Sequence, residues 1–230
     1  MTLQGSAAAR AAGDRALPLR ERKKLRNRRA LADAALRLFA ARGFDATTLE
    51  ELADEAEVSK STFSRIFPAK EAAGIEAEAE LWSAYLAALA ERKLSGPVLG
   101  ELHQALAATV TGLDPGWDAR FLATRRLIIA EPALLRYVEH YRAQTKEKVA
   151  ATLAARLGLG PEDLRPHVLA EIIMTAFSLS GRRWVRRDGK DGRAALVDGL
   201  ADAVKAVPAS LDLSVPGGQP VPLHVRNSGA

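Results

Sequence analysis

Apolar residues recur at the spacing of an α-helix along almost the whole chain. The clearest early example is a set of five residues that follow the i, i+3, i+4, i+7, i+8 rule and so share one helix face: Leu31, Ala34, Ala35, Leu38 and Phe39. We find no convincing run of alternating apolar and polar residues rich in Val, Ile and Thr, as a half-buried β-strand would show. The pattern therefore predicts an all-α fold.

Glycine and proline residues divide this pattern into separate helices. Gly43 is placed to end the first helix, and a long helix is expected from about Lys70 to Leu94. Further breaks, each containing Gly or Pro, predict helices near 98–112, 117–130, 133–158, 166–187 and 192–206. From Pro208 the chain is rich in Pro and Gly without periodicity, so we expect residues 208–230 to form a flexible tail.

One stretch of the chain encodes two short helices joined by a tight turn. Thr47 or Thr48 caps the first helix, since each is followed three residues later by a glutamate that can complete a capping box. Ser59 caps the second helix, and Val58 before it can pack against Phe63 as a hydrophobic staple. The second helix is therefore expected to be held rigidly against the first.

The second short helix has two chemically different sides. One side is expected to pack into the core: Thr62, Phe63, Ile66 and Phe67. The other side is polar and free to meet a ligand: Lys60, Ser61, Ser64 and Arg65. A helix in the major groove of DNA reads base edges with short hydrogen-bonding side chains and with Arg or Lys, and this side supplies both. Arg65 is the best candidate for a bidentate contact with guanine.

Positive charge is concentrated near the start of the chain. The formal net charge is +5, but residues 1–30 hold nine Lys and Arg against Asp14 and Glu21, which makes this segment +7 and the remainder −2. Seven of these cations can contact phosphates or reach a minor groove: Arg20, Arg22, Lys23, Lys24, Arg26, Arg28 and Arg29. Beside a two-helix motif, such a segment favours DNA binding over a merely solvated run of charge.

The sequence carries little sign of catalysis, metal binding or export. It has no cysteine, and its four histidines have no metal-ligand spacing. No nucleophile, base and orienting group stand at catalytic spacing, so we expect no enzymatic activity, no cofactor and no metal. Arg10 interrupts the alanine-rich opening, and the most apolar stretch, residues 168–179, contains Glu171 and is too short to span a bilayer. We therefore expect a soluble, cytoplasmic protein without a membrane partner.

Residues 20–71 resemble a known family. They are similar to the N-terminal domain of TetR-family transcriptional regulators in a basic lead-in and in four matches: ALRLFAARGF at 35–44, TTL at 47–49, VSKSTF at 58–63 and FPAKE at 67–71. The resemblance implies that residues 60–65 form the recognition helix and that Lys70 touches the DNA backbone. The expected DNA-binding residues are Arg22, Lys24, Arg28, Thr47, Thr48, Ser59, Lys60, Ser61, Thr62, Ser64, Arg65 and Lys70.

Three positions depart from the family pattern. Glu57 stands where the turn usually has Gly, so a left-handed backbone there would be strained and would bring a negative charge near DNA. Ser64 and Ile66 stand where the family often has Tyr and His late in the recognition helix. Two phosphate contacts that are usual in the family are thereby altered. The arginines of residues 20–29 can make up for them with phosphate contacts of their own.

The rest of the chain agrees in length with the family's variable regulatory domain. The resemblance implies an effector cavity, although an ordinary helical core would contain the same aromatic residues. The expected lining is Trp82, Tyr85, Leu86, Leu89, Phe121, Arg125, Tyr137, Tyr141 and Phe177. The family's last two long helices pair with those of a second subunit, which implies a homodimer. The expected interface residues are Val168, Ile172, Ile173, Ala176, Leu196, Leu200, Ala203 and Val204.

These observations predict four segments and one principal function. The segments are a flexible arm at 1–19, a helix-turn-helix domain at 20–70, an effector-binding and dimerisation domain at 71–207 and the tail at 208–230. The function is that of a repressor released from a palindromic, double-stranded DNA operator by a small-molecule effector. The alternative is a nonspecific DNA-compacting or anionic-surface-binding protein driven by the basic arm.

Overall fold

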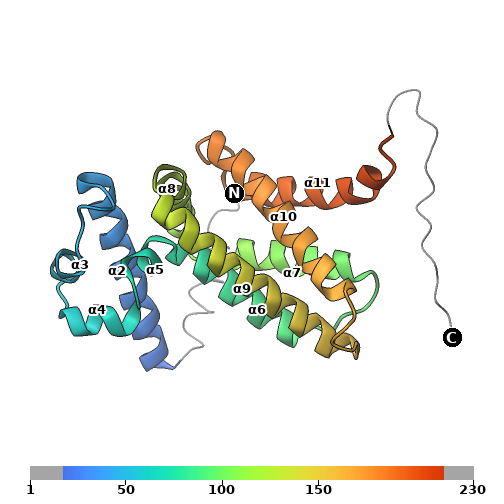
Figure 1. Cartoon of the computed structure of the whole chain (residues 1–230), viewed down its shortest axis with the longest axis horizontal. Helices are drawn as coiled ribbons and strands as arrows, with labels where there is room; N and C mark the ends of the chain where they lie inside the picture. Colours follow the sequence, from blue (N-terminus) through green and yellow to red (C-terminus); the bar gives the residue numbers. More distant parts are fainter. Residues whose placement is uncertain (1–17, 215–230) are drawn as a thin grey trace, which may run out of the picture.

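The computed structural model describes residues 18–214, and within them the chain forms α-helices and no β-strand (Figure 1). The all-α prediction is therefore confirmed. In chain order the helices are α2 (Leu19–Arg42), α3 (Leu49–Glu55), α4 (Lys60–Ile66), α5 (Lys70–Gly74), α6 (Glu76–Glu91), α7 (Val98–Gly112), α8 (Trp117–Ala130), α9 (Pro132–Leu157), α10 (Arg165–Arg186) and α11 (Gly192–Leu211). Figure 1 shows α3 and α4 at one end of the molecule, well separated from α10 and α11.

The single helix expected from Lys70 to Leu94 is in fact two helices. The break lies at Ile75, whose φ of −104° and ψ of 10° separate α5 from α6. The hydroxyl of Thr124 donates a buried hydrogen bond of 2.9 Å to the Gly74 carbonyl, which gives this carbonyl a partner outside the helix. A Cβ atom on Gly74 would stand 3.4 Å from Leu134, so the chain also packs closely against α9 here.

Helices reach close to both ends of the described chain. α2 begins at Leu19, so the basic segment forms the first turns of a helix. α11 continues through Pro208 to Leu211, although a proline inside a helix lacks the backbone donor and its ring crowds the carbonyl four residues earlier. The remainder of the predicted arm and tail, residues 1–17 and 215–230, lies outside the described residues.

An apolar core joins the N-terminal helices to α8 and α9. Phe39, Phe63 and Phe67 pack in it together with Leu134 and Val138 of α9. Each of these five side chains is at most 3% exposed. The helix-turn-helix is therefore fixed directly against the helices of the larger half of the molecule.

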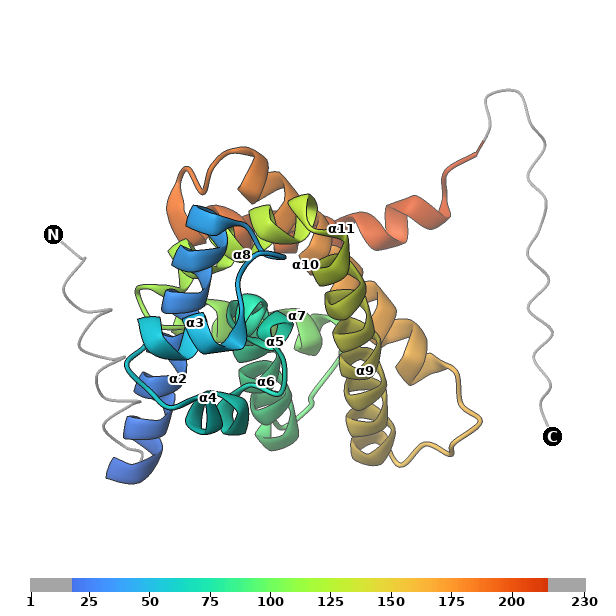
Figure 2. The same ribbon diagram turned by 60° about the vertical axis from the view of Figure 1, so that its left-hand side comes forward.

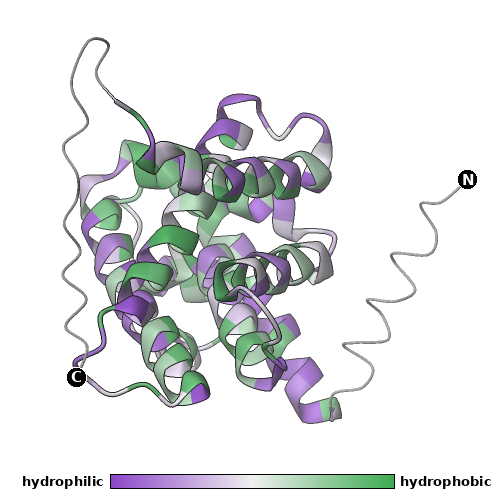
Figure 3. Ribbon diagram, turned by 90° about the vertical axis from the view of Figure 1, so that its right-hand side faces the viewer, coloured by the Kyte–Doolittle hydropathy of each residue, from purple (hydrophilic) through white to green (hydrophobic). Residues whose placement is uncertain are grey.

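A second core fills the space among helices α6 to α11. It contains Trp82, Trp117, Phe121 and Phe177, and the indole N–H of Trp117 donates a 2.7 Å hydrogen bond to the Ala77 carbonyl. Figure 3 shows apolar and polar residues alternating along the ribbons, as amphipathic helices around a core require. Within residues 18–214 no helix is both long and apolar enough to cross a membrane.

α10 and α11 cross at a close contact. The hydroxyl of Ser180 on α10 donates a 2.6 Å hydrogen bond to the Leu196 carbonyl on α11. A Cβ atom on Gly199 would lie only 2.6 Å from the Ser180 oxygen, so a residue with a side chain fits there only if Ser180 moves. These two helices therefore form a tight antiparallel pair joined by a short loop.

Candidate DNA-binding surface and regulatory cleft

α4 presents a polar flank to solvent. Its outward side chains are all exposed: Lys60, Ser61, Ser64 and Arg65. On the opposite side Phe63 and Phe67 are fully buried, with ring centroids 5.6 Å apart. Figure 2 turns this end of the molecule forward and shows α4 beside the first half of α2. An exposed polar flank on a helix anchored by two buried rings suits a reader of the major groove.

Capping side chains fix the ends of α3 and α4. Thr48 is the N-cap of α3 and forms a complete capping box with Glu51, in which the Glu51 N–H donates to Thr48 Oγ1 at 3.2 Å and the Thr48 N–H donates to Glu51 Oε2 at 2.8 Å. Ser59 is the N-cap of α4, and its Oγ accepts the N–H of Thr62 at 3.2 Å. Of the two capping boxes allowed by the sequence, the structure forms the one at Thr48.

Glu57 adopts the left-handed backbone expected from its position in the turn. Its φ is +52°, in the region that favours glycine. The turn is nevertheless well bonded, because the Glu57 N–H donates to the Asp54 carbonyl at 3.0 Å and the Val58 N–H donates to the Ala53 carbonyl at 2.9 Å. Neighbouring bonds thus hold a strained residue between the two short helices.

Two predicted DNA contacts, Thr47 and Lys70, are occupied inside the protein. Thr47 is 1% exposed, and its hydroxyl donates a 2.7 Å hydrogen bond to the Gly43 carbonyl. The ammonium of Lys70 donates to the carbonyls of Phe44 at 2.7 Å and Thr47 at 3.1 Å, and it lies 4.5 Å from the centre of the Phe44 ring. This geometry argues against phosphate contacts by these two side chains, which instead brace the loop between α2 and α3.

Arg28, another predicted DNA contact, is also engaged within the protein. Its guanidinium forms a two-pronged ion pair with Glu76 of α6, one prong measuring 2.7 Å, and donates to the Ile66 carbonyl at 2.9 Å. It also lies 4.5 Å from the centre of the Phe67 ring. Burial raises the pKa of Glu76 despite the opposing effect of Arg28. Arg28 therefore ties the end of α4 to the start of α6.

Arg22 and Lys24 lie on different sides of α2, because residues two apart in a helix point about 200° apart. The Lys24 side chain is 73% exposed and has Glu21 4.0 Å away, so it stays available to a phosphate. Arg22 is half-buried and lines a hollow shared with Arg120 of α8, where its Nε has no hydrogen-bond partner within the described residues. This places Arg22 toward the regulatory helices.

Most of the predicted effector-cavity residues form a filled core. Trp82 and Phe177 meet edge to face at 5.3 Å, and Phe121 lies 5.9 Å from Phe177. The rings of these three residues therefore pack against one another. Tyr85, Leu89 and Phe121 are fully buried, Leu86 and Tyr141 pack at the edge of this core, and Tyr137 packs in the core of the DNA-binding half.

A polar cleft of about 220 Å³ lies between α9 and α10. Three of the predicted effector-binding residues line it: Trp82, Arg125 and Phe177. We call it the α9–α10 cleft. It is completed by Glu78, Glu139, Arg142, Lys146, Met174, Thr175, Ser178 and Arg182. The charged residues come from four helices, α6, α8, α9 and α10, so no local motif revealed them.

Glu78 is the central charge of the α9–α10 cleft. Its side chain is 2% exposed and accepts hydrogen bonds from Arg142 Nη2 at 2.8 Å and Arg125 Nη1 at 3.4 Å. Burial alone would raise the pKa of Glu78, but the hydrogen bonds and positive charge of Arg142, with the charge of Arg125, outweigh it and lower that pKa. Glu78 therefore remains ionised at neutral pH.

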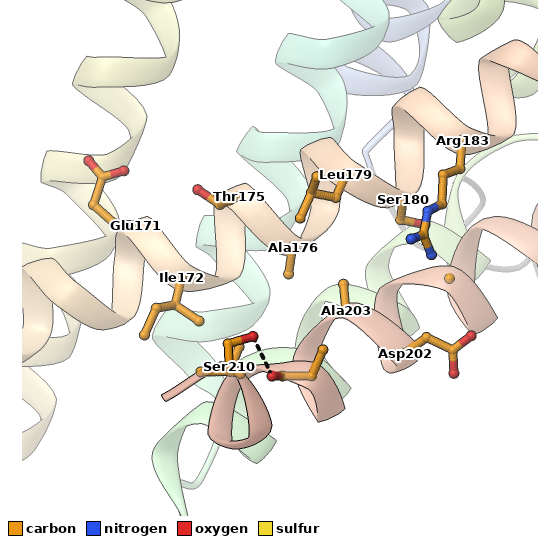
Figure 4. Close-up of a pocket in the computed structure, with 13 residues that line it drawn as sticks. Glu171, Ile172, Thr175, Ala176, Leu179, Ser180, Arg183, Asp202, Ala203 and Ser210 are labelled. Atoms are coloured by element: carbon orange, nitrogen blue, oxygen red, sulfur yellow. Dashed lines mark hydrogen bonds between the residues drawn. The ribbon is translucent and has the colours of Figure 1, made fainter. Parts of the chain in front are cut away.

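Part of the predicted dimer interface is buried within one chain. Ile173, Leu196 and Leu200 are fully buried and Ala176 is 3% exposed. These residues hold α10 and α11 in the monomer core, which corrects their assignment to a surface between subunits. Val168 is 54% exposed, and Ile172 and Ala203 line a groove of about 360 Å³ between α10 and α11 (Figure 4). Val204 packs partly against the core.

Comparison with known proteins gives matches to both halves of the chain. Residues 31–72 match the model of the bacterial regulatory proteins of the tetR family, and residues 96–212 match that of the MftR C-terminal domain. The regulator TcmR of Streptomyces glaucescens is 30% identical over 182 residues, which are 75% of this chain and 79% of TcmR. MftR of Mycobacterium tuberculosis is 26% identical over 190 residues, which are 79% of this chain and 89% of MftR.

A solved structure shows the same fold at lower identity. GusR of Salmonella enterica has a TM-score of 0.50 and 18% identity, with 82% of this chain and 97% of that chain covered. The two family matches include α3 and α4 in the first segment and α7 to α11 in the second. The resemblance that residues 20–71 indicated is therefore confirmed and extends to the larger half. The chain belongs to the TetR family of bacterial transcriptional regulators.

Proposed function

We propose that this regulator is a homodimeric repressor that binds a twofold-symmetric operator through α4 and leaves it when a small-molecule effector binds. The observation that carries the proposal is the exposed flank of α4. Its two short hydroxyls, Ser61 and Ser64, lie beside the cations Lys60 and Arg65. A recognition helix needs this combination to read base edges in a major groove.

The proposed contacts divide into base-reading and phosphate-binding groups. Arg65 makes no hydrogen bond or ion pair with any residue that the structure describes, so its guanidinium is free for a bidentate guanine contact. Thr48 and Ser59 are exposed at the starts of α3 and α4, where backbone N–H groups suit phosphate. Exposed Lys24 adds electrostatic attraction that carries no sequence information.

The proposed dimer face is the outer side of α10 and α11. When the buried residues of α10 are left out, exposed and half-exposed residues still form one stripe at helical spacing. The stripe begins at the residue before α10 and consists of Leu164, Val168, Ile172, Thr175 and Leu179. Ile172 on α10 and Ala203 on α11 line the groove between the two helices, and Figure 4 shows them on its two sides. A twofold dimer through this face would present two copies of α4 to half-sites about 34–36 Å apart.

Effector release requires two dimer shapes with different spacing of the α4 helices. A ligand that binds the wider shape more tightly lowers operator affinity by that difference in binding free energy. α5 and α6 lie between the helix-turn-helix and the α9–α10 cleft, so a shift of α6 can reach both.

DNA competition tests the central part of the proposal. Fragments of the source genome are selected by binding, and the selected site is compared with random DNA at physiological salt. A preference of about 10³ or more is expected. A ratio near one would support the alternative, a protein that compacts DNA or binds anionic surfaces without reading sequence.

Light scattering tests the dimer separately. We expect the wild type to have twice the monomer mass at micromolar concentration. The variant Leu179→Glu should shift toward monomer, because Leu179 is 43% exposed in the single chain and a glutamate there would place a charge against the partner subunit. Leu19→Glu, also on an exposed leucine but at the far end of the molecule, is the matched control. A wild-type monomer would contradict the proposal.

A further inference from the structure

The α9–α10 cleft and a neighbouring hollow hold more positive than negative charge. The hollow, about 350 Å³, shares Arg125, Arg142 and Arg182 with the cleft and adds Arg186. With Lys146, five cations line the two spaces against the carboxylates of Glu78 and Glu139. Even when Glu171, which pairs with Lys146 at 2.9 Å, is counted, two positive charges remain unmatched. The site is therefore electrostatically suited to an anion.

Arg125 is the least satisfied of these cations. Its side chain is only 9% exposed, yet its one hydrogen bond to another residue of the described chain is the 3.4 Å contact with Glu78. A guanidinium has five N–H donors, and burial without partners is costly. Burial lowers the pKa of Arg125, and the nearby charges of Arg142 and Arg182 act in the same direction. An incoming anion would supply the missing acceptors.

A second buried donor in the cleft has only a poorly placed acceptor. Trp82 is 2% exposed, and its indole N–H faces the Glu78 carboxylate closely enough to help lower the pKa of Glu78, but without the geometry of a full hydrogen bond. Trp82 and Arg125 come from α6 and α8, so donors from two helices depend on the one carboxylate of Glu78. Because native proteins pair nearly all buried polar groups, a further acceptor in this space would be favourable.

The neighbouring hollow adds an apolar wall. Ile128 and Val185 form its inner part, while Ile129 and Leu135 stand at its mouth with 80% and 45% of their surface exposed. Together Ile129 and Leu135 provide a surface for a hydrocarbon group. The cleft can thus hold an anionic head group, and the neighbouring hollow can hold an apolar tail.

We propose that the α9–α10 cleft binds an organic anion with an apolar chain, such as an alkyl carboxylate or alkyl phosphate. This inference names the effector class and so rests on the proposed function. The head group binds Arg125 and Arg142 in competition with Glu78, and Trp82 donates its indole N–H. The chain lies along Ile129 and Leu135. Arg182 and Arg186, which have no ion pair in the described part of the chain, attract the anion at the mouth.

The position of Glu78 connects this site to DNA binding. Glu76, two residues earlier on α6, is held by Arg28, and Arg28 also binds the Ile66 carbonyl at the end of α4. An anion that takes Arg125 and Arg142 leaves the buried Glu78 carboxylate without its partners, which is unfavourable. The first turn of α6 must then move, and Arg28 transmits that movement to α4.

Calorimetry without DNA tests the site, with decyl phosphate and decanoate as probes and decanol as the uncharged control. We expect both anions to bind and decanol to bind about tenfold more weakly or not at all, since a charge-assisted hydrogen bond contributes on the order of a factor of ten. The two anions distinguish a phosphate preference from a carboxylate preference. Equal binding of decanol, or no binding of either anion, would overturn the proposal.

Two variants locate the binding. Arg125→Met should weaken anion binding by about tenfold or more, because it keeps the volume but removes the buried charge. Ile129→Glu, at a position 80% exposed and therefore safe for folding, should weaken it by roughly threefold or more through repulsion at the mouth. Leu19→Glu, similarly exposed but distant, should leave binding unchanged. Unchanged binding in Ile129→Glu and Arg125→Met would place the anion elsewhere.

A separate measurement distinguishes this proposal from the proposed function. Release of the selected operator fragment by decyl phosphate is followed by fluorescence anisotropy, with Arg125→Met as the comparison. Release from the wild type and retention by the variant are expected. If the anion binds but no DNA sequence is bound specifically, the assignment of the cleft stands and the proposed repressor function is rejected. If DNA is bound specifically but no anion binds, the repressor function stands and the assignment of the cleft is rejected.

Discussion

Arg65 on α4 and Arg28 on α2 carry the same charge in the same small domain, but their surroundings are opposite. Arg65 is exposed and has no polar partner in the described chain, whereas Arg28 meets Glu76, the Ile66 carbonyl and the ring of Phe67. The difference arises from what lies across from each side chain, since only Arg28 faces a buried carboxylate. Arg28 is therefore engaged within the protein, whereas Arg65 stays available to DNA.

The largest expected effect is on stability, at Arg28. Arg28→Ala should lower the free energy of unfolding by about 2 kcal/mol or more, because it leaves Glu76, whose side chain is 7% exposed, without its partner. The loss should be less than that of a fully buried pair, since the Arg28 side chain is 34% exposed. Urea denaturation measures it. Arg65→Ala, the matched control, should stay within about 0.5 kcal/mol of the wild type.

A second variant decides whether the ion pair itself is responsible. In Arg28→Met combined with Glu76→Gln, no buried charge is left unpaired, so most of the lost stability should return. If the double variant is as unstable as Arg28→Ala, the contact of Arg28 with Phe67 and not the ion pair would explain the loss.

The next largest effect concerns DNA recognition by Arg65. Arg65→Ala should weaken binding to the selected operator by about 1–3 kcal/mol and relax preference at one base pair, while stability is unchanged. Arg65→Lys keeps the charge and removes the bidentate geometry, so it should lose preference but retain most affinity for random DNA. Titrations on operator and random duplexes measure both quantities. An equal loss on the two duplexes would reduce Arg65 to a phosphate contact.

Lys60 lies between these two extremes. It pairs with Glu50, but both side chains are 57% exposed, so water and phosphate can replace the partner easily. Lys60→Gln should lower affinity evenly on all sequences and reduce the salt slope by about 1. Glu50→Gln should raise affinity, because it frees Lys60. Opposite signs for these two changes are the result to look for in salt titrations, and a loss in both would show that the pair itself orders the DNA-binding surface.

Local sequence patterns predicted the helices and the orientation of α4 well. Helical periodicity does not depend on distant partners, and caps such as Ser59 act on residues three positions away. The side of α4 that holds Phe63 and Phe67 could likewise be found from spacing alone. These features are decided within one or two turns of chain.

Contacts between distant segments were not predictable in the same way. Lys70 binds carbonyls 23 to 26 residues away, and Arg28 meets a carboxylate 48 residues away. The aromatic residues of the regulatory half were equally ambiguous, because rings that fill a core and rings that line a cavity have the same helical spacing. Ile173 and Leu200 show the same difficulty at α10 and α11, where an apolar stripe does not reveal which helix covers it.

The smallest expected effect concerns the strained turn at Glu57. A left-handed backbone costs a residue with a side chain about 1–2 kcal/mol, and glycine avoids this cost but loses about 0.5–1 kcal/mol through its greater freedom when unfolded. With φ at +52°, Glu57→Gly should therefore stabilise the protein by about 0.5–1 kcal/mol. Glu57→Gln, which keeps the strain, should not change stability in the same urea titration. Both variants remove a negative charge near α4, so both should bind DNA slightly more tightly, and to the same extent. A further gain in DNA affinity with Gly alone would mean that the strain at Glu57 also holds α4 away from its best position in the groove.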